Sequence, residues 1–205
     1  MKECIRKFID KLSDPVCAII PGDFDAYLKE VSVDVRSAYK KNITRYEVFK
    51  IDVLDENLLI RISDIWHSSD TRQGRPINYN YEAVNGCICD ISDRWSISDY
   101  GALNFGSQKL EMFVCTDEHK VVVGYLELLS SNGLSIVHST LGHKDKLKDN
   151  IMRYIFSSVV KMKIPDMKYL VYNNYNKCEP LYHFKEDLNI ISRGMLGILR
   201  KESYK

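Results

Sequence analysis

Residues 121–161 constrain the fold more than any other stretch, because their hydrophobic period changes from strand-like to helical. Residues 121–128 are mostly β-branched, aromatic or aliphatic, which is typical of a strand. Asn132 and Gly133 tolerate positive φ and predict a tight turn into a second strand over 134–137. The chain then places apolar residues at three- and four-residue spacing, on one face of a helix: Leu147, Ile151, Tyr154, Ile155 and Val159.

The loop that leads into this helix is a candidate phosphate site. A helix N-terminus carries free N–H groups and the positive end of the helix dipole, and both favour an anion. The loop also contains a glycine, several lysines and a histidine that can donate a hydrogen bond or orient the loop. The alternative is a solvated lysine cluster balanced by neighbouring aspartates. The residues that we expect at the phosphate are Leu141, Gly142, His143, Lys144, Lys146 and Lys148.

The polar segment 67–76 is a second candidate binding region, and its composition predicts a loop. Arg72 and Arg75 are separated by Gln73 and a glycine, and guanidinium groups bind carboxylate or phosphate with two parallel hydrogen bonds. The alternative is that the arginines pair with acids of their own loop. Tyr79 follows and can stack on a sugar or base, although a core tyrosine on a strand is the competing interpretation. We expect these four residues to contact an acceptor molecule.

The order of hairpin, glycine-containing loop and helix resembles the cofactor-binding core of the GNAT acyltransferase superfamily. Residues 141–152 and 72–76 are also similar to motifs of poorly characterised GNAT-like proteins, and the resemblance covers about 47–200. It implies an α/β (α+β) fold, with a mixed, mostly antiparallel sheet and helices on both faces. Residues 45–205 are then expected to form the acyltransferase domain, and residues 1–44 an N-terminal helical extension.

The resemblance also implies that an amine or hydroxyl attacks a thioester directly. Such a reaction needs a base, an acid for the leaving thiolate and donors for the developing oxyanion. Glu127 shares a strand face with Tyr125 and Leu129, so it is a candidate base that points into a cleft in the sheet. The alternative is an ordinary solvent-facing strand residue. Tyr182 stands where the family often keeps a tyrosine acid near the thiol.

Three candidate functions follow from the resemblance and from the positions where this sequence departs from the family signature. The first is transfer of an acyl group from acetyl-CoA or another acyl-CoA to an amine or hydroxyl of a small-molecule, sugar or envelope-precursor acceptor. The second is a non-catalytic GNAT-shaped binding module, because only Gly142 remains of the signature Arg/Gln-x-x-Gly-x-Gly/Ala. The third is an aminoacyl-tRNA-dependent transferase, which would explain the lysines near Gly142 and the arginines at 72 and 75. Specific binding of a donor would separate these hypotheses.

Charge and hydropathy restrict the partners and the location. The formal net charge of +1 argues against a broad nucleic-acid-binding surface, so tRNA is the one nucleic acid that we consider. No apolar run approaches the roughly 20 residues that span a bilayer, and the N-terminus lacks the apolar core of a signal peptide. We therefore expect a cytoplasmic protein without a membrane span. The sequence leaves the oligomeric state open.

Cysteine spacing gives little support to a metal site. The chain has six cysteines, which we expect to be free thiols rather than a disulfide framework. Cys87 and Cys89 with Cys115 and His119 form the best candidate zinc set, but Cys-x-Cys is a weak spacing. We therefore expect no metal. The sequence also lacks the Gly-x-Ser-x-Gly, Walker and His-Glu-x-x-His motifs.

The remaining pattern predicts further elements. Asp23 or Asp25 is the expected cap of a helix over 24–42, and Asp55 is the expected cap of a helix that extends to Trp66. Strands are expected at 45–51, 110–114 and 169–172, and helices at 2–13 and 179–188.

Overall fold

The computed structural model describes residues 14–52, 55–69, 71–72, 75–76, 104–105, 108–174, 181–192, 194 and 199. The expectations for the helix at 2–13 and for Gln73, Tyr79, Cys87 and Cys89 lie outside these described residues.

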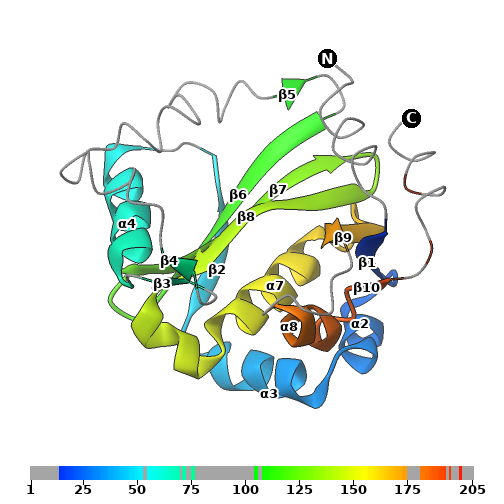
Figure 1. Cartoon of the computed structure of the whole chain (residues 1–205), viewed down its shortest axis with the longest axis horizontal. Coiled ribbons are helices and arrows are strands. Elements are labelled where there is room, and N and C mark those ends of the chain that lie inside the picture. The colour runs from blue at the N-terminus through cyan, green and yellow to red at the C-terminus, as the bar shows by residue number, and fades with distance from the viewer. Residues whose placement is uncertain are drawn as a thin grey trace.

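An eight-stranded sheet forms the centre of the molecule (Figure 1). Its strand order is β10-β1-β9-β8-β7-β6-β2, and β5 pairs separately with β6. Neighbouring strands are antiparallel except β8 and β9, which are parallel. The strands are β1 (Pro15–Ile19), β2 (Glu47–Ile51), β5 (Asn104–Phe105), β6 (Gln108–Thr116), β7 (Val122–Ser131), β8 (Leu134–Gly142), β9 (Tyr169–Asn174) and β10 (Ile191–Ser192). A separate two-stranded ladder pairs β3 (Thr71–Arg72) with β4 (Arg75–Pro76).

Helices cover both faces of the sheet. They are α2 (Phe24–Glu30), α3 (Val33–Asn42), α4 (Glu56–His67), α7 (Ile151–Lys163) and α8 (Tyr182–Asp187), with a 3-10 helix η2 (Lys144–Asp149) before α7. Ile62 and Ile65 of α4 pack against Met112 and Tyr125 on one face. On the other face α7 packs against β6, β7 and β8, and α3 packs against α7 (Figure 1). The expected mixed, mostly antiparallel sheet with helices on both faces is confirmed.

Strand alternation explains how one sheet serves two cores. On β7, Leu126 and Leu128 belong to the core beneath α7, whereas Tyr125 belongs to the core beneath α4. Alternate residues of a strand point to opposite faces, so a nearly continuous apolar strand can be buried on both sides. Phe156 and Val159 of α7 complete the larger core and are almost fully buried.

Residues 15–42 belong to this same sheet and core. β1 lies between β9 and β10, and α3 packs directly on α7. The rings of Tyr39 and Tyr154 are 5.9 Å apart, and the hydroxyl of Tyr154 donates to the Tyr46 carbonyl at 2.7 Å. The part of the expected helical extension that the structure describes therefore supplies one strand and two helices to the main unit.

Capping side chains set several helix boundaries. The Asp55 carboxylate accepts from the Leu58 amide at 2.8 Å, and the Asp23 carboxylate accepts from the Ala26 amide at 2.8 Å, so both expected caps are confirmed. The prediction of one helix over 24–42 is wrong. Ser32 adopts an extended conformation and its hydroxyl accepts from the Val35 amide, which starts a second helix. No helix among the described residues has the length and hydrophobicity needed to cross a membrane.

Candidate functional site

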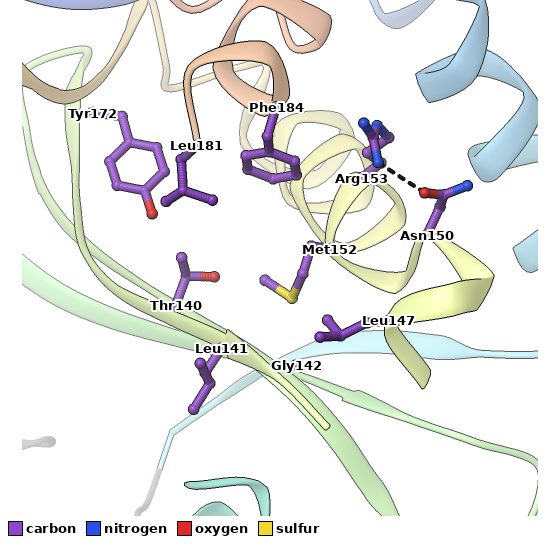
Figure 2. A pocket seen from close by; sticks show the side chains of 10 residues that line it. All are labelled: Thr140, Leu141, Gly142, Leu147, Asn150, Met152, Arg153, Tyr172, Leu181 and Phe184. Atoms are coloured by element: carbon purple, nitrogen blue, oxygen red, sulfur yellow. Dashed lines mark hydrogen bonds between the residues drawn. The ribbon is translucent and has the colours of Figure 1, made fainter. Parts of the chain in front are cut away.

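The candidate site lies where β8 and β9 cease to pair. Their parallel register runs from Leu134 opposite Tyr169 to Ile136 opposite Val171 and ends there, although both strands continue. Helix α7 links the two strands, and its first turn approaches the opening between them (Figure 2). A cavity of about 240 Å³ occupies this position. Its described lining comprises Thr140, Leu141, Gly142, Leu147, Asn150, Met152, Arg153, Tyr172, Leu181 and Phe184.

Most of the lining is apolar, with two hydroxyl groups on the strand side. Figure 2 shows that Met152, Leu181 and Phe184 reach into the same space, and that the Tyr172 hydroxyl is directed towards Thr140. The Thr140 hydroxyl donates to the Tyr125 carbonyl at 2.9 Å. Such a lining suits an extended chain that carries both methylene and amide groups, because few polar groups need to be desolvated.

Helix α7 presents its N-terminus to the cavity. The helix begins at Ile151, after Asn150 in the left-handed conformation (φ 57°, ψ 35°). Asn150 makes no side-chain capping hydrogen bond; its side-chain oxygen accepts from Nη1 of Arg153 at 2.8 Å. The first-turn amides, including those of Met152 and Arg153, have no acceptor within the helix. These N–H groups and the helix dipole make the rim of the cavity favourable for an anion.

Arg153 is a charged residue of this rim that the sequence reasoning missed. Its Nε donates to Oδ2 of Asp187 at 3.0 Å, and its guanidinium lies 5.7 Å from the ring centre of Phe184. Arg153 therefore joins the first turn of α7 to α8 across one side of the cavity. Its position in the first turn of the predicted helix is a sequence signal for this role, although the lysines of the preceding loop are the more numerous cationic candidates.

The structure separates the six residues that were expected at a phosphate. Leu141 and Gly142 line the cavity, and Figure 2 shows the Leu141 side chain turned away from it. The lysines of the loop lie on η2 rather than in the first turn of α7, and Lys146 is 3.4 Å from Asp117. The expected residues that do not belong to the described lining are His143, Lys144, Lys146 and Lys148.

Local hydrogen bonds explain the position of this loop. The His143 amide donates to the Val123 carbonyl at 2.8 Å, and the Asp145 amide donates to Nδ1 of His143 at 3.3 Å. The Lys144 amide donates to the Ser68 hydroxyl at 3.0 Å. The loop is thus fixed to the end of α4 and to β7. His143 serves here as loop architecture, which was one of the roles proposed from the sequence.

Asp149 holds η2 against α3. Its carboxylate accepts from the Tyr46 hydroxyl at 3.0 Å and contacts Arg45 and Lys41 at 3.3 and 3.4 Å. Burial alone raises the pKa of the carboxyl group, but hydrogen bonds from Tyr46, Arg45 and Lys41 outweigh burial and hold the pKa below its usual range. Burial, assisted by the hydrogen bond to Asp149, raises the pKa of Tyr46 to about 12. These contacts fix the approach of the chain to the N-terminus of α7.

Two glycines let α7 lie close to the sheet beside the cavity. Gly124 of β7 and Gly142 of β8 are register partners. A Cβ at Gly142 would lie 2.8 Å from Sδ of Met152, and one at Gly124 would lie 2.6 Å from Cδ1 of Ile155. The absence of a side chain at these two positions therefore sets the distance between β8 and the first turns of α7.

Glu127 is buried and hydrogen-bonded rather than solvent-facing. Its side chain is 4% exposed, and Oε2 lies 3.0 Å from Nδ1 of His138. The register shifts at this point, because Glu127 pairs with Ser139 whereas Leu128 pairs with Val137. His138 is the extra residue of this β-bulge. Sequence alternation placed Glu127 on the face that it occupies, but nothing in the sequence indicated the bulge.

The structure does not place Glu127 and Tyr182 in the lining of the same cavity. Glu127 shares the face of Tyr125, beneath α4. Tyr182 is the first residue of α8, which packs through Phe184 against Phe156 in the core beneath α7. Neither Glu127 nor Tyr182 belongs to the described lining of the cavity.

The arginine segment forms a short hairpin. Arg72 and Arg75 are cross-strand partners in the antiparallel β3–β4 ladder. This part of the expected loop therefore consists of two short paired strands. Ser68, just before this hairpin, is the residue bonded to Lys144. The start of the hairpin is therefore fixed near the end of β8.

Among the described residues, no group of three or more His, Cys, Asp or Glu side chains is arranged to hold a metal ion. Cys115 is completely buried in the core beneath α7, and burial raises the pKa of its thiol. His119 lies on the exposed turn before β7. These positions give no support to the candidate zinc set.

Solved structures share this arrangement. The chain is similar to FemX, with a TM-score of 0.63 at 10% identity, over 85% of this chain and 58% of that chain. It also matches a tandem GNAT protein from the clavulanic acid biosynthesis pathway, with a TM-score of 0.50 at 10% identity, over 89% of this chain and 51% of the other. The fold is GNAT-like.

A conserved protein of unknown function from Bacteroides thetaiotaomicron matches with a TM-score of 0.51 at 12% identity, over 87% of this chain and 56% of that chain. The chain spans only 51–58% of the length of these three structures. No protein-family model and no curated protein matches the chain. The GNAT-like fold is consequently established by structure and not by sequence similarity.

Proposed function

We propose that this chain is an acyltransferase that takes an acyl group from acetyl-CoA or another acyl-CoA. The acceptor is an amine or hydroxyl of a small molecule, a sugar or an envelope precursor. The observation that carries the proposal is the cavity between β8 and β9, with the N-terminus of α7 at its rim. The GNAT-like fold supports the reaction class.

In this proposal, the pantetheine arm of the donor lies along β8 beyond Ile136, where the β8–β9 register has ended. Its amide groups can hydrogen-bond to the strand backbone as an added strand would. Its methylene groups contact Met152 and Phe184, and the pyrophosphate meets the first-turn amides of α7. The cavity of about 240 Å³ is smaller than the roughly 300–1,000 Å³ of a site that encloses a whole drug-sized ligand. It therefore suits an arm whose nucleotide end stays at the surface.

The proposed chemistry divides between the two faces of the sheet. Glu127, which the sequence indicates as the candidate base, lies on the face beneath α4, on the acceptor side. Tyr182 was proposed as the acid for the leaving thiolate, but the Tyr172 hydroxyl is the tyrosine hydroxyl directed into the described cavity. Comparison of Tyr172→Phe with Tyr182→Phe assigns the acid, because only the group that protonates the thiolate should lower kcat without weakening donor binding.

The acceptor is proposed to bind on the face beneath α4. The hairpin of Arg72 and Arg75, with Gln73 and Tyr79, would supply its contacts. Ser68 fixes the start of this hairpin beside the end of β8, next to the proposed donor. Two guanidinium groups would favour an acceptor that carries a carboxylate or phosphate.

A non-catalytic binding module is the second candidate. The observation that favours it is the loop before α7, whose His143 and Lys146 are engaged by Asp145 and Asp117 instead of lining the cavity. A binding module would bind a CoA thioester without releasing thiol. A tRNA-dependent transferase would instead release an aminoacyl group from tRNA and leave acyl-CoA unbound.

The experiment combines donor binding with thiol release. Isothermal titration with acetyl-CoA, longer acyl-CoAs, CoA and aminoacyl-tRNA identifies the donor, and thiol release with an amine panel measures turnover. Thr140→Phe fills the cavity and should weaken acyl-CoA binding by about tenfold or more, roughly 1.4 kcal/mol. Thr44→Phe makes the same change at an exposed turn residue outside the described cavity and should not. Equal affinity in both variants would rule out this cavity as the donor site.

A further inference from the structure

The β-bulge on β8 places a histidine against the buried carboxylate of Glu127. Nδ1 of His138 lies 3.0 Å from Oε2 of Glu127. The two side chains differ sharply in exposure, at 42% for His138 and 4% for Glu127. The carboxylate is thus buried, while part of the imidazole reaches the surface.

The pairing fixes the orientation of the imidazole. If the carboxylate is ionised it only accepts hydrogen bonds, so Nδ1 then donates and the lone pair of a neutral ring lies on Nε2. Orientation of a base by a buried carboxylate is the arrangement used in nucleophile–histidine–carboxylate sites. Bulges commonly re-aim one side chain at such sites.

The bulge also lies beside the proposed donor cavity. Thr140, which lines the cavity, is two residues further along β8, at a strand rise of about 3.3 Å per residue. From Val137 onward the described β8–β9 register has ended. The edge of β8 between His138 and Thr140 therefore lies between the donor cavity and the face beneath α4.

We propose that His138 is the general base of the transfer reaction and that Glu127 is its positioning residue. This inference rests on the acyltransferase function proposed above and assigns a role within that same site. It transfers the role of base from Glu127, the candidate indicated by the sequence, whose side chain is 4% exposed, to the imidazole that this carboxylate contacts.

The proposed step conserves atoms and charge. The acceptor nitrogen forms a bond to the thioester carbonyl carbon, the C–S bond breaks, and Nε2 of His138 takes the proton lost by nitrogen. The thiolate leaves and takes a proton from the tyrosine acid proposed above, which is reprotonated from solvent, and His138 returns its proton to solvent. Glu127 stays ionised throughout and stabilises the transient imidazolium.

The test compares His138→Gln, His138→Gly and Glu127→Gln with the wild type and with His119→Gln, an exposed histidine on the turn before β7. Acetyl-CoA affinity is measured by titration, and kcat by thiol release with an amine panel and with water as acceptor. His138→Gln should lower kcat about a hundredfold or more. Glu127→Gln should lower it about tenfold or more, and both should leave donor affinity within about twofold.

Chemical rescue separates a base from a structural residue. Added imidazole should raise the rate of His138→Gly and leave that of Glu127→Gln unchanged. Full turnover in both His138 variants, or no rescue of His138→Gly, would overturn the assignment, as would a wild type that binds donor but releases no thiol. A wild type that does not bind acyl-CoA would instead overturn the proposed function itself. His138 is partly exposed, so its variants are expected to fold. They therefore still test the proposal if Glu127→Gln unfolds.

Discussion

Gly142→Ala and Gly124→Ala make a matched test of how α7 and β8 shape the cavity. The two glycines face each other across β7 and β8 and both lie under α7. Only Gly142 lines the described cavity. We predict that Gly124→Ala lowers stability more than Gly142→Ala does, whereas Gly142→Ala weakens donor binding more.

The magnitudes follow from the neighbours that an added Cβ would meet. At Gly124 the Cβ would lie 2.6 Å from Ile155 and 3.2 Å from the Leu141 carbonyl oxygen, and the latter is backbone that cannot rotate away. At Gly142 the nearest atom is Sδ of Met152 at 2.8 Å, on a flexible side chain. Overpacking costs about 1–3 kcal/mol. We expect Gly124→Ala near the upper end and Gly142→Ala near the lower end.

The assay pairs thermal unfolding with donor titration. For a chain of this size, 1 kcal/mol shifts Tm by about 2–4 °C, so Gly124→Ala should lower Tm by up to about 12 °C. Gly142→Ala should lower Tm less but weaken acyl-CoA binding about tenfold, because Met152 must move into the cavity. Gly124→Ala should leave affinity within about twofold. Equal loss of affinity in both variants, or a loss only in Gly124→Ala, would refute this reasoning.

Three further predictions concern charged residues. Arg153→Ala should weaken acyl-CoA binding more than Asp187→Asn does, which titration of both variants measures; equal losses would mean that Arg153 acts only through its ion pair. Asp149→Asn should lower Tm at pH 7, because the folded state depresses the pKa of Asp149 and is therefore stabilised by the ionised carboxylate. This stabilisation is complete above the pKa of the unfolded chain, about 4, and is lost as the pH falls below it. The difference in Tm between wild type and variant should therefore shrink from about pH 5 to about pH 2, and a constant difference would contradict the prediction. Arg72→Ala and Arg75→Ala should weaken acceptor binding by about 1.5–3 kcal/mol while Tm stays nearly constant, and unfolding of either variant would show a structural role.

Elements with a strong local pattern could be predicted from the sequence. The two strand-like runs on either side of Asn132 and Gly133, and the change to a helical period after residue 137, located β7, β8 and α7, because side-chain periodicity is set by backbone geometry. The cap at Asp55 was equally local. The break at Ser32 was missed, because Tyr27, Val31, Val35 and Tyr39 continue a helical spacing through it.

The cavity depended on tertiary contacts that no local pattern encodes. Tyr172 and Phe184 come from β9 and α8, and they meet the first turn of α7 only after the sheet has formed. Lys146 was counted as phosphate charge, but Asp117, distant in sequence, engages it in the fold. The bulge at His138 likewise depends on strand register, which single-residue preferences do not determine.

The most direct test of this account is a structure of the chain with CoA bound. We predict that the pantetheine arm lies between β8 and β9, and that the pyrophosphate accepts hydrogen bonds from the first-turn amides of α7, next to Arg153. CoA bound elsewhere on the molecule, with the cavity between Thr140 and Phe184 empty, would contradict the central claim.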